Sequence, residues 1–406
     1  GKNGEMATFQ SLATAIAAQV GTGNLAGAAT ALIGGGPGAI FWMWVSAFFG
    51  MSTIYAEATL AQQYKVKKDG EVTGGPVYYI RAAFKGTFGK ALAAIFAILI
   101  VLALGFTGNM VQSNSIGAAF NNAFHVPKLA VGICVAVIAG IIFIGGIKRI
   151  ANVSQVVVPF MAVLYVVFAV LLLLCNVTKI PDAIVQIVQG AFGYGDSIQG
   201  IRAVAGGVLG AMMAAMQNGV ARGIFSNEAG LGSAPIAAAA AKTKDTVRQG
   251  LVSMTGTFID TIVICTMTGL AIVISGSWAN PDLKGVAITT EAFQSGLPFP
   301  SVVSSFVLMI CLAFFAFTTI LGWDYYSERC LEYLSNRNKT VVKVYRWIYV
   351  LAVFIGPYLT VAAVWTIADI FNGLMAIPNV IALIALSGVV AKETRDYFKE
   401  FDRLSK

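Results

Sequence analysis

The chain contains ten apolar segments, most of them long enough to cross a lipid bilayer. A membrane-spanning helix needs about 20 consecutive apolar residues. Only 11% of the 406 residues are charged, whereas soluble domains carry about 25%, and a water-soluble protein this apolar would lack polar surface. We therefore expect an all-α polytopic membrane protein with about ten spans, at residues 9–33, 39–62, 91–119, 129–147, 153–175, 201–240, 251–275, 302–325, 347–364 and 365–390.

The first segment is interrupted by a polar stretch that contains two glycines, Val20-Gly21-Thr22-Gly23-Asn24. Glycine inside a helix costs about 1 kcal/mol relative to alanine. A backbone group without a partner in hydrocarbon costs several kcal/mol more. The interruption is tolerated only where it faces protein, a cavity or a ligand, so it predicts a binding site inside the membrane.

Basic residues are distributed unevenly between alternate connections. One set of connections carries most of the 27 lysines and arginines, whereas the other carries only Lys128, Lys179 and Lys284. Cytoplasmic loops of membrane proteins are the basic ones, so both ends of this chain are predicted to be cytoplasmic. The net charge of +8 then belongs to these loops, and we expect no nucleic-acid partner.

The sixth segment also contains helix-breaking residues. Met216-Gln217-Asn218-Gly219 is followed by Asn227-Glu228-Ala229-Gly230 and by Pro235. Segments one and six would be the first spans of two halves with five spans each. Because five is odd, the second half starts on the opposite side of the membrane from the first, so the two halves have inverted orientations. Broken helices at matching positions of inverted repeats indicate a mid-membrane site in transporters. We place the two repeats at 1–176 and 177–406.

Several ionisable residues fall within the predicted spans, where they are functional candidates. Glu57, Arg222, Glu228 and Asp324 are interpreted as members of interior salt bridges. Asp260 has no evident partner in the sequence; it either pairs with another group, binds a cation or is protonated.

Enzyme signatures are weak. Gly21-Thr22-Gly23-Asn24-Leu25-Ala26 fits a relaxed dinucleotide-binding pattern, but that motif requires a strand before it and a soluble βαβ unit around it. The chain has no phosphate-binding GxxxxGK[ST] motif, and its single histidine, His125, falls in an external connection. We therefore do not expect an enzyme.

Several long motifs resemble the alanine/glycine:cation symporter family of the amino acid–polyamine–cation superfamily. They are GTGNLAGAATALIGGGPGAIFWMWVSAFFGMSTIYAE, GGPVYYI, GVARGIFSNEAGLGSAPIAAAAAKT, VRQGLVSMTGTFIDT and AFTTILGW, and the resemblance extends over nearly the whole chain. It implies the inverted five-plus-five bundle typified by the bacterial leucine transporter, and cotransport of small amino acids with Na⁺. Family members often have one more upstream span, and this chain begins at Gly1, so we expect upstream sequence.

The first break suits an amino-acid carboxylate, because the amides after it lie at a helix N-terminus. We predict that Thr22, Gly23 and Asn24 hold the carboxylate. The ammonium group would be accepted by carbonyl or amide oxygens at the sixth-span break, which we place around Met216, Gln217, Asn218 and Gly219, with Phe225 as an alternative wall. Gln112 and Trp365 are further candidates for lining the substrate pocket.

A cation site is predicted at Thr318 and Thr319, because a hard cation such as Na⁺ prefers oxygen ligands. From the residues alone, these hydroxyls could equally bond back to the preceding helical turn. The family resemblance implies that the carbonyls of Ala17, Val20 and Phe315 complete a Na⁺ site.

The resulting expectation is a Na⁺-coupled importer of alanine or glycine in the plasma membrane of a prokaryote, without an obligate protein partner. Two alternatives stay open: a proton-coupled amino-acid transporter that uses Asp260, and a channel or receptor with the same fold.

Overall fold

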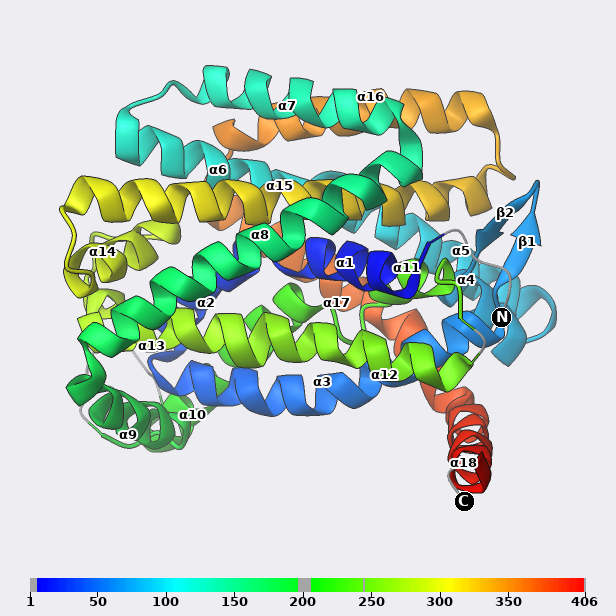
Figure 1. Ribbon diagram of the computed structural model, residues 1–406, viewed down its shortest axis with the longest axis horizontal. Helices are drawn as coiled ribbons and strands as arrows, with labels where there is room; N and C mark the ends of the chain where they lie inside the picture. The colour runs from blue at the N-terminus through cyan, green and yellow to red at the C-terminus, as the bar shows by residue number, and fades with distance from the viewer. Residues whose placement is uncertain (1–5, 196–205, 244, 405–406) are drawn as a thin grey trace.

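Long helices that lie side by side form the body of the molecule in the computed structural model (Figure 1), which describes residues 6–195, 206–243 and 245–404. The first half of the chain contains α1 (Thr8–Gln19), η1 (Gly23–Gly27), α2 (Ala28–Gly35), α3 (Gly38–Gln63), β1 (Val66–Lys68), β2 (Glu71–Thr73), α4 (Pro76–Ala83), α5 (Gly86–Leu102), η2 (Ala103–Gly108), α6 (Asn109–Phe124), α7 (Lys128–Ile144) and α8 (Gly146–Cys175).

The second half begins with a short helix pair, η3 (Val177–Lys179) and α9 (Ile180–Ala191). It continues with α10 (Gly207–Asn227), α11 (Ala234–Ala239), α12 (Thr246–Thr257), η5 (Phe258–Cys265), α13 (Thr266–Ser275), η6 (Ser277–Ala279), α14 (Val286–Gly296), α15 (Ser301–Leu334), α16 (Lys339–Ile355), η7 (Gly356–Tyr358), α17 (Val361–Ala385) and α18 (Ser387–Leu404). The start of the predicted sixth span, residues 201–205, and Arg202 with it, lies outside the described residues.

Membrane-length helices account for most of these elements. Seven described helices are long and apolar enough to cross a membrane, or eight when α1 and the helix that follows its break are counted as one bent span. Large aliphatic side chains lie on the outside of the bundle, among them Ile144, Val302 and Ile384, each at least 70% exposed. Such side chains are stable outside the bundle in lipid, so the expectation of an all-α polytopic membrane protein is confirmed.

Each of the ten predicted segments corresponds to one helix or to two or three consecutive helical elements, with three differences. The sixth is divided into α10 and α11. The last two are separated at Gly356 and Pro357 rather than at residue 364, because proline cannot continue the hydrogen bonding of α16. A small antiparallel hairpin, β1–β2, joins α3 to α4 and was not expected.

Two interrupted helices cross near the centre of the bundle and position the site. α1 and α2 form the first, with a bend of 47° between them, and α10 and α11 form the second. The start of α1 is tied to the end of α11, because Met6 N donates to Ala240 O and Lys242 N donates to Met6 O at 3.2 and 2.8 Å. α3, α12 and α15 pack around this crossing.

Candidate functional site

The first break is stabilised by side chains from its own helix and from α6. Val20 has an extended backbone conformation, which ends α1. Gly21 N donates to Asn24 Oδ1 at 2.8 Å, and Thr22 N donates to Gln112 Oε1 at 2.9 Å. The Thr22 hydroxyl is buried without a partner among the described residues. Thr22, Gly23, Asn24 and Gln112 therefore lie together, and the Thr22 amide is already bonded to Gln112; their role in holding a substrate stays a prediction.

The second break lies farther along the chain than predicted. α10 is continuous through Asn227, and the interruption runs from Glu228 to Ser233, where Glu228, Gly230 and Gly232 have positive φ angles. Placing the break around Met216 to Gly219 was wrong, because carbonyls inside an α-helix accept hydrogen bonds from residues four positions on.

The four residues assigned to that break do not meet the first break. Gln217 is exposed, and Asn218 Nδ2 donates to Ala214 O at 2.9 Å within its own helix. Asn218 also packs against Gly34, whereas Gly219 packs against Ala39 of α3. Asn218 and Gly219, which suggested a break, instead occupy helix-packing surfaces of α10, whereas Gln217 lies on its exposed face and Met216 is half-buried.

Asp260, in the π-helical segment η5, joins the two broken helices. Its carboxylate accepts hydrogen bonds from Asn24 Nδ2, Ser226 Oγ and Thr261 Oγ1 at 2.8 to 2.9 Å, and Asp260 is fully buried. Asn227 Nδ2 extends the network to Thr261 Oγ1 at 3.0 Å. Ser226 is a member that sequence reasoning missed, because a single serine in a helix carries no distinctive pattern. π-Helical segments inside α-helices are frequent at functional sites.

Two other buried carboxylates hold the loop of the second break. Glu57 accepts from Gly232 N and Gly230 N at 3.0 and 3.3 Å, and from Asn379 Nδ2 at 2.6 Å. Glu228 accepts from Ser233 Oγ at 2.9 Å and from Trp323 Nε1.

The predicted salt bridges are largely wrong. Arg222 does form one, but its partner is Asp369 of α17, and over the described residues no basic side chain pairs with Glu57, Glu228 or Asp324. Sequence position gives the depth of a charge in the membrane but not the helix that it faces.

Aromatic rings close one side of the first break. The Phe225 and Trp365 ring centroids are 4.7 Å apart, and the Arg222 guanidinium lies 4.5 Å from the Trp365 ring centroid. A Cβ at Gly23 would lie 3.2 Å from Phe225 Cδ1, and a Cβ at Gly27 would lie 3.3 Å from Trp365 Cη2. Both aromatic residues thus stand against the first broken helix, and their role as walls of a substrate pocket stays a prediction.

Four of the five residues predicted as cation ligands, Ala17, Val20, Phe315 and Thr319, meet where α15 crosses the end of α1, whereas the Thr318 hydroxyl lies against its own helix and Met161 Sδ of α8. Thr319 Oγ1 lies 3.1 Å from Ala17 O, 3.3 Å from Val20 O and 3.0 Å from Phe315 O. Thr318 Oγ1 lies 3.1 Å from Phe315 O. Both hydroxyls also bond back along α15, but Thr319 in addition contacts carbonyls of another helix.

The fold is that of known secondary transporters. The structure of MhsT in complex with L-phenylalanine superposes with a TM-score of 0.63 and 13% identity, over 97% of this chain and all of that one. A Na⁺-coupled sialic acid symporter in a substrate-bound outward-open state gives a TM-score of 0.62 and 11% identity, over 95% of this chain and 78% of that one. These superpositions show that the bundle with two broken helices is a fold shared with those proteins.

Sequence comparison identifies the family. A profile of the sodium:alanine symporter family matches residues 1–405. An uncharacterized transporter of Haemophilus influenzae is 50% identical over 98% of this chain and 85% of its own length. The sodium/alanine symporter AgcS of Methanococcus maripaludis is 46% identical over 97% and 84%, and the probable sodium/glutamine symporter GlnT of Bacillus subtilis is 43% identical over 97% and 78%.

The chain therefore belongs to the sodium:alanine symporter family. It is a multi-pass membrane protein that transports amino acids coupled to Na⁺, with Na⁺ as the co-transported ion, and it is not an enzyme.

Proposed function

We propose that this transporter carries alanine or glycine together with Na⁺ by alternating access around the two broken helices. The proposal rests on one observation: carbonyl oxygens from the end of α1 and from α15 surround a single threonine hydroxyl. Thr319 Oγ1 has three carbonyl oxygens within 3.3 Å, but it has a single proton to donate. A cation bound among Ala17, Val20, Phe315, Thr318 and Thr319 would balance this excess of acceptors.

The substrate carboxylate is assigned to the first break. The unpartnered hydroxyl of Thr22 and the backbone of Gly23 and Asn24 lie at the start of η1, where helical N–H groups favour an anion. Gln112 would exchange its bond with the Thr22 amide for a bond with the substrate. We assign the ammonium group to the end of α10 near Phe225 and Ser226, which stand directly against Gly23.

A small substrate side chain fits this arrangement. The Phe225 and Trp365 rings are in contact with each other and close to Gly23 and Gly27, so the space beside the first break is narrow. This favours alanine and glycine over the glutamine named for one relative.

Alternating access would use contacts on the two sides of the site. The Arg222–Asp369 ion pair and the Trp365 ring lie on one side, whereas the bonds between Met6 and the end of α11 lie on the other. When the contacts on one side break and those on the other side stay formed, the site is exposed to one face of the membrane. Na⁺ and the amino acid both stabilise the closed crossing, so each raises the affinity for the other.

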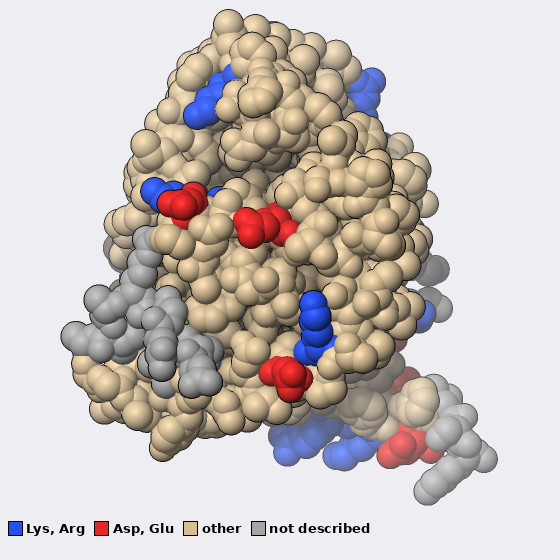
Figure 2. Space-filling model, turned by 90° about the vertical axis from the view of Figure 1, so that its left-hand side faces the viewer, with Lys and Arg blue, Asp and Glu red and all other residues tan. Residues whose placement is uncertain are grey.

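For the orientation, we propose two inverted repeats, 1–176 and 177–406, with both ends of the chain cytoplasmic. The opposite end of the bundle, near α9 and α14, presents few charged side chains (Figure 2). This agrees with the low number of basic residues predicted for external connections.

Uptake into proteoliposomes tests the function. Labelled alanine and glycine should accumulate inside the vesicles when an inward Na⁺ gradient is imposed. They should not accumulate when K⁺ replaces Na⁺, or when only a pH gradient is present. Accumulation of glutamine but of neither small amino acid would reject the proposed substrate. Uptake driven by protons without Na⁺ would reject the proposed coupling.

A further inference from the structure

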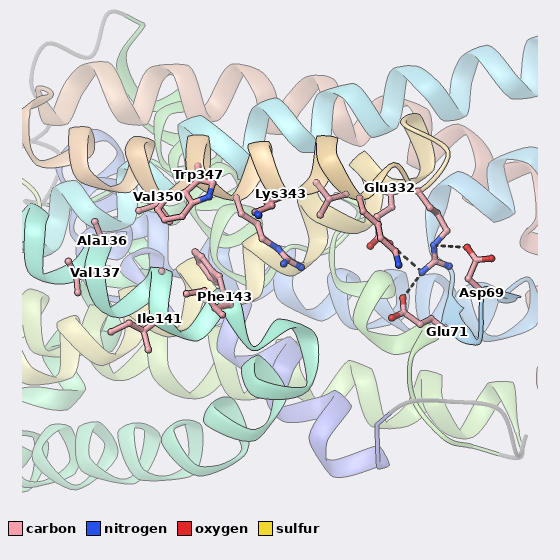
Figure 3. A pocket seen from close by; sticks show the side chains of 16 residues that line it. Asp69, Glu71, Ala136, Val137, Ile141, Phe143, Glu332, Lys343, Trp347 and Val350 are labelled. Atoms are coloured by element: carbon pink, nitrogen blue, oxygen red, sulfur yellow. Dashed lines mark hydrogen bonds and ion pairs between the residues drawn. The ribbon is translucent and has the colours of Figure 1, made fainter.

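A groove of about 830 Å³ lies on the flank of the bundle between α7 and α16, away from the transport site. Figure 3 shows aliphatic and aromatic side chains at one end of the groove and charged side chains at the other. The apolar end is formed by Ala136, Val137, Gly140, Ile141, Phe143 and Ile144 of α7 and by Trp347 and Val350 of α16.

The carboxylates at the charged end are paired. Arg337 pairs with Glu71 and with Asp69, the latter at 3.5 Å, and Arg329 pairs with Glu332 at 3.0 Å. Burial acts against the charge of Glu71, but hydrogen bonds and attraction from the two arginines hold its pKa below the ordinary value. These acidic groups are neutralised by neighbours within the protein.

Two lysines in the same groove have no acidic partner. Over residues 6–195, 206–243 and 245–404, no carboxylate oxygen lies within 4.0 Å of the ammonium group of Lys339 or Lys343. The neighbouring Arg346 is held by Glu328 through two bonds of 2.6 and 2.8 Å. The groove therefore has surplus positive charge at one end.

One face of α16 changes in character along the helix. Lys339, Lys343, Trp347 and Val350 follow one another at spacings of four, four and three residues, which places them on one face. Trp347 is 65% exposed. Tryptophan concentrates at the level of lipid headgroups, so its position between the lysines and the apolar end marks the boundary of the bilayer.

We propose that this groove binds an anionic phospholipid, with its phosphate on Lys339 and Lys343 and one acyl chain along α7 between Ile141 and Val350. Basic pockets between membrane helices attract acidic lipid headgroups. The order of charged, aromatic and aliphatic side chains matches that of phosphate, glycerol and acyl chain along a lipid. A zwitterionic lipid would gain less binding free energy, because the positive group of its own headgroup would be repelled by the two lysines.

Native mass spectrometry of the full-length chain, titrated with phosphatidylglycerol and with phosphatidylcholine of the same acyl chains, tests the proposal. One phosphatidylglycerol should bind more tightly than phosphatidylcholine. A lysine near an anionic membrane surface contributes roughly fivefold in affinity. Lys339→Ala combined with Lys343→Ala should therefore weaken phosphatidylglycerol binding roughly 30-fold.

A matched control uses two exposed lysines of α18. Lys392→Ala combined with Lys399→Ala removes the same charge outside the groove and should leave the affinity unchanged. An equal loss in this control, or no preference for phosphatidylglycerol, would overturn the proposal in favour of non-specific attraction.

A third variant, Gly140→Leu, fills the apolar end. A Cβ there meets only Val350 Cγ2, at 3.9 Å, so the new side chain extends into the groove without disturbing the backbone. Binding of phosphatidylglycerol should fall at least fivefold while the melting temperature is retained. Unchanged binding would show that no acyl chain occupies the groove and would reject the assignment.

Discussion

At the scale of the residue, Thr319 distinguishes a cation site from an ordinary helix hydroxyl. Besides the carbonyl of Phe315 in its own helix, Thr319 contacts the carbonyl of Ala17 in α1 and that of Val20, the residue at which α1 ends. That cross-helix contact explains how a cation would join α1 to α15.

Replacing Thr319 by alanine should raise the Na⁺ concentration needed for alanine uptake. Loss of an oxygen ligand to a charged group is worth about 1.5–3 kcal/mol, or roughly 10- to 150-fold. Thr319→Ser retains the hydroxyl and should stay near the wild type. Thr255→Ala removes a hydroxyl that bonds only within α12 and serves as the control. An unchanged Na⁺ dependence in Thr319→Ala would remove this residue from the site.

Gly27 tests the proposed size limit. In Gly27→Ala the new methyl group would lie 3.3 Å from the edge of Trp365 and push the ring toward the substrate. Uptake of alanine should fall relative to glycine by roughly tenfold, because one methyl group in a tight pocket is worth about 1–3 kcal/mol. Gly373→Ala, where a Cβ meets no atom within 4 Å, is the control. Equal effects on both amino acids would contradict the assignment of this wall.

At the scale of the element, the loop between α10 and α11 is held by other helices in addition to the bonds within the loop. Glu57 of α3 and Asn379 of α17 bond to its backbone at Gly230 and Gly232. The hydroxyl of Tyr79 in α4 completes the set by donating to Asn379 Oδ1. The break in the sixth span therefore depends on three other helices, α3, α4 and α17, as well as on the loop itself.

Glu57→Ala should destabilise the protein. It leaves the amides of Gly230 and Gly232 without their acceptor and removes one of the two acceptors of Asn379 Nδ2, and each buried unpaired group costs about 1–3 kcal/mol. The melting temperature in detergent should fall clearly, with Glu57→Gln intermediate because one acceptor oxygen is retained. Glu400→Ala, on the exposed face of α18, should melt like the wild type. Melting of Glu57→Ala at the wild-type temperature would show that the loop is held by other contacts.

The extents of the helices were largely predictable, because long apolar runs give the spans directly. The first break was also predictable, since two glycines and two polar residues interrupt a continuous apolar run. The position of the second break was not, because Met216 to Gly219 and Asn227 to Gly230 both contain an amide and a glycine. Close packing against α2 and α3 lets the first of these stretches remain helical.

At the scale of the whole molecule, the uneven distribution of basic residues predicts the orientation of the protein in the membrane, with both chain ends cytoplasmic. With exposed Cys134 and Cys175 replaced by serine, Lys399→Cys should react with an impermeant maleimide only from the cytoplasmic side. Lys284→Cys, in the connection before α14, should react only from outside. Labelling of both positions from the same side would reject the proposed topology and the inverted repeats.

The sequence by itself determined the class of fold, the positions of the spans and the first broken helix, because burial in lipid imposes strict demands on composition and on backbone hydrogen bonds. It also singled out Thr318 and Thr319 as candidate cation ligands, and the family resemblance added the carbonyls of Ala17, Val20 and Phe315 to that prediction. Only the tertiary structure decided which groups meet: Asp260 with Asn24 and Ser226, Arg222 with Asp369, and Glu57 with the loop of the second break. Such pairs are separated by tens to hundreds of residues, and the rotation of each helix about its axis, which packing sets, determines which side chains face each other.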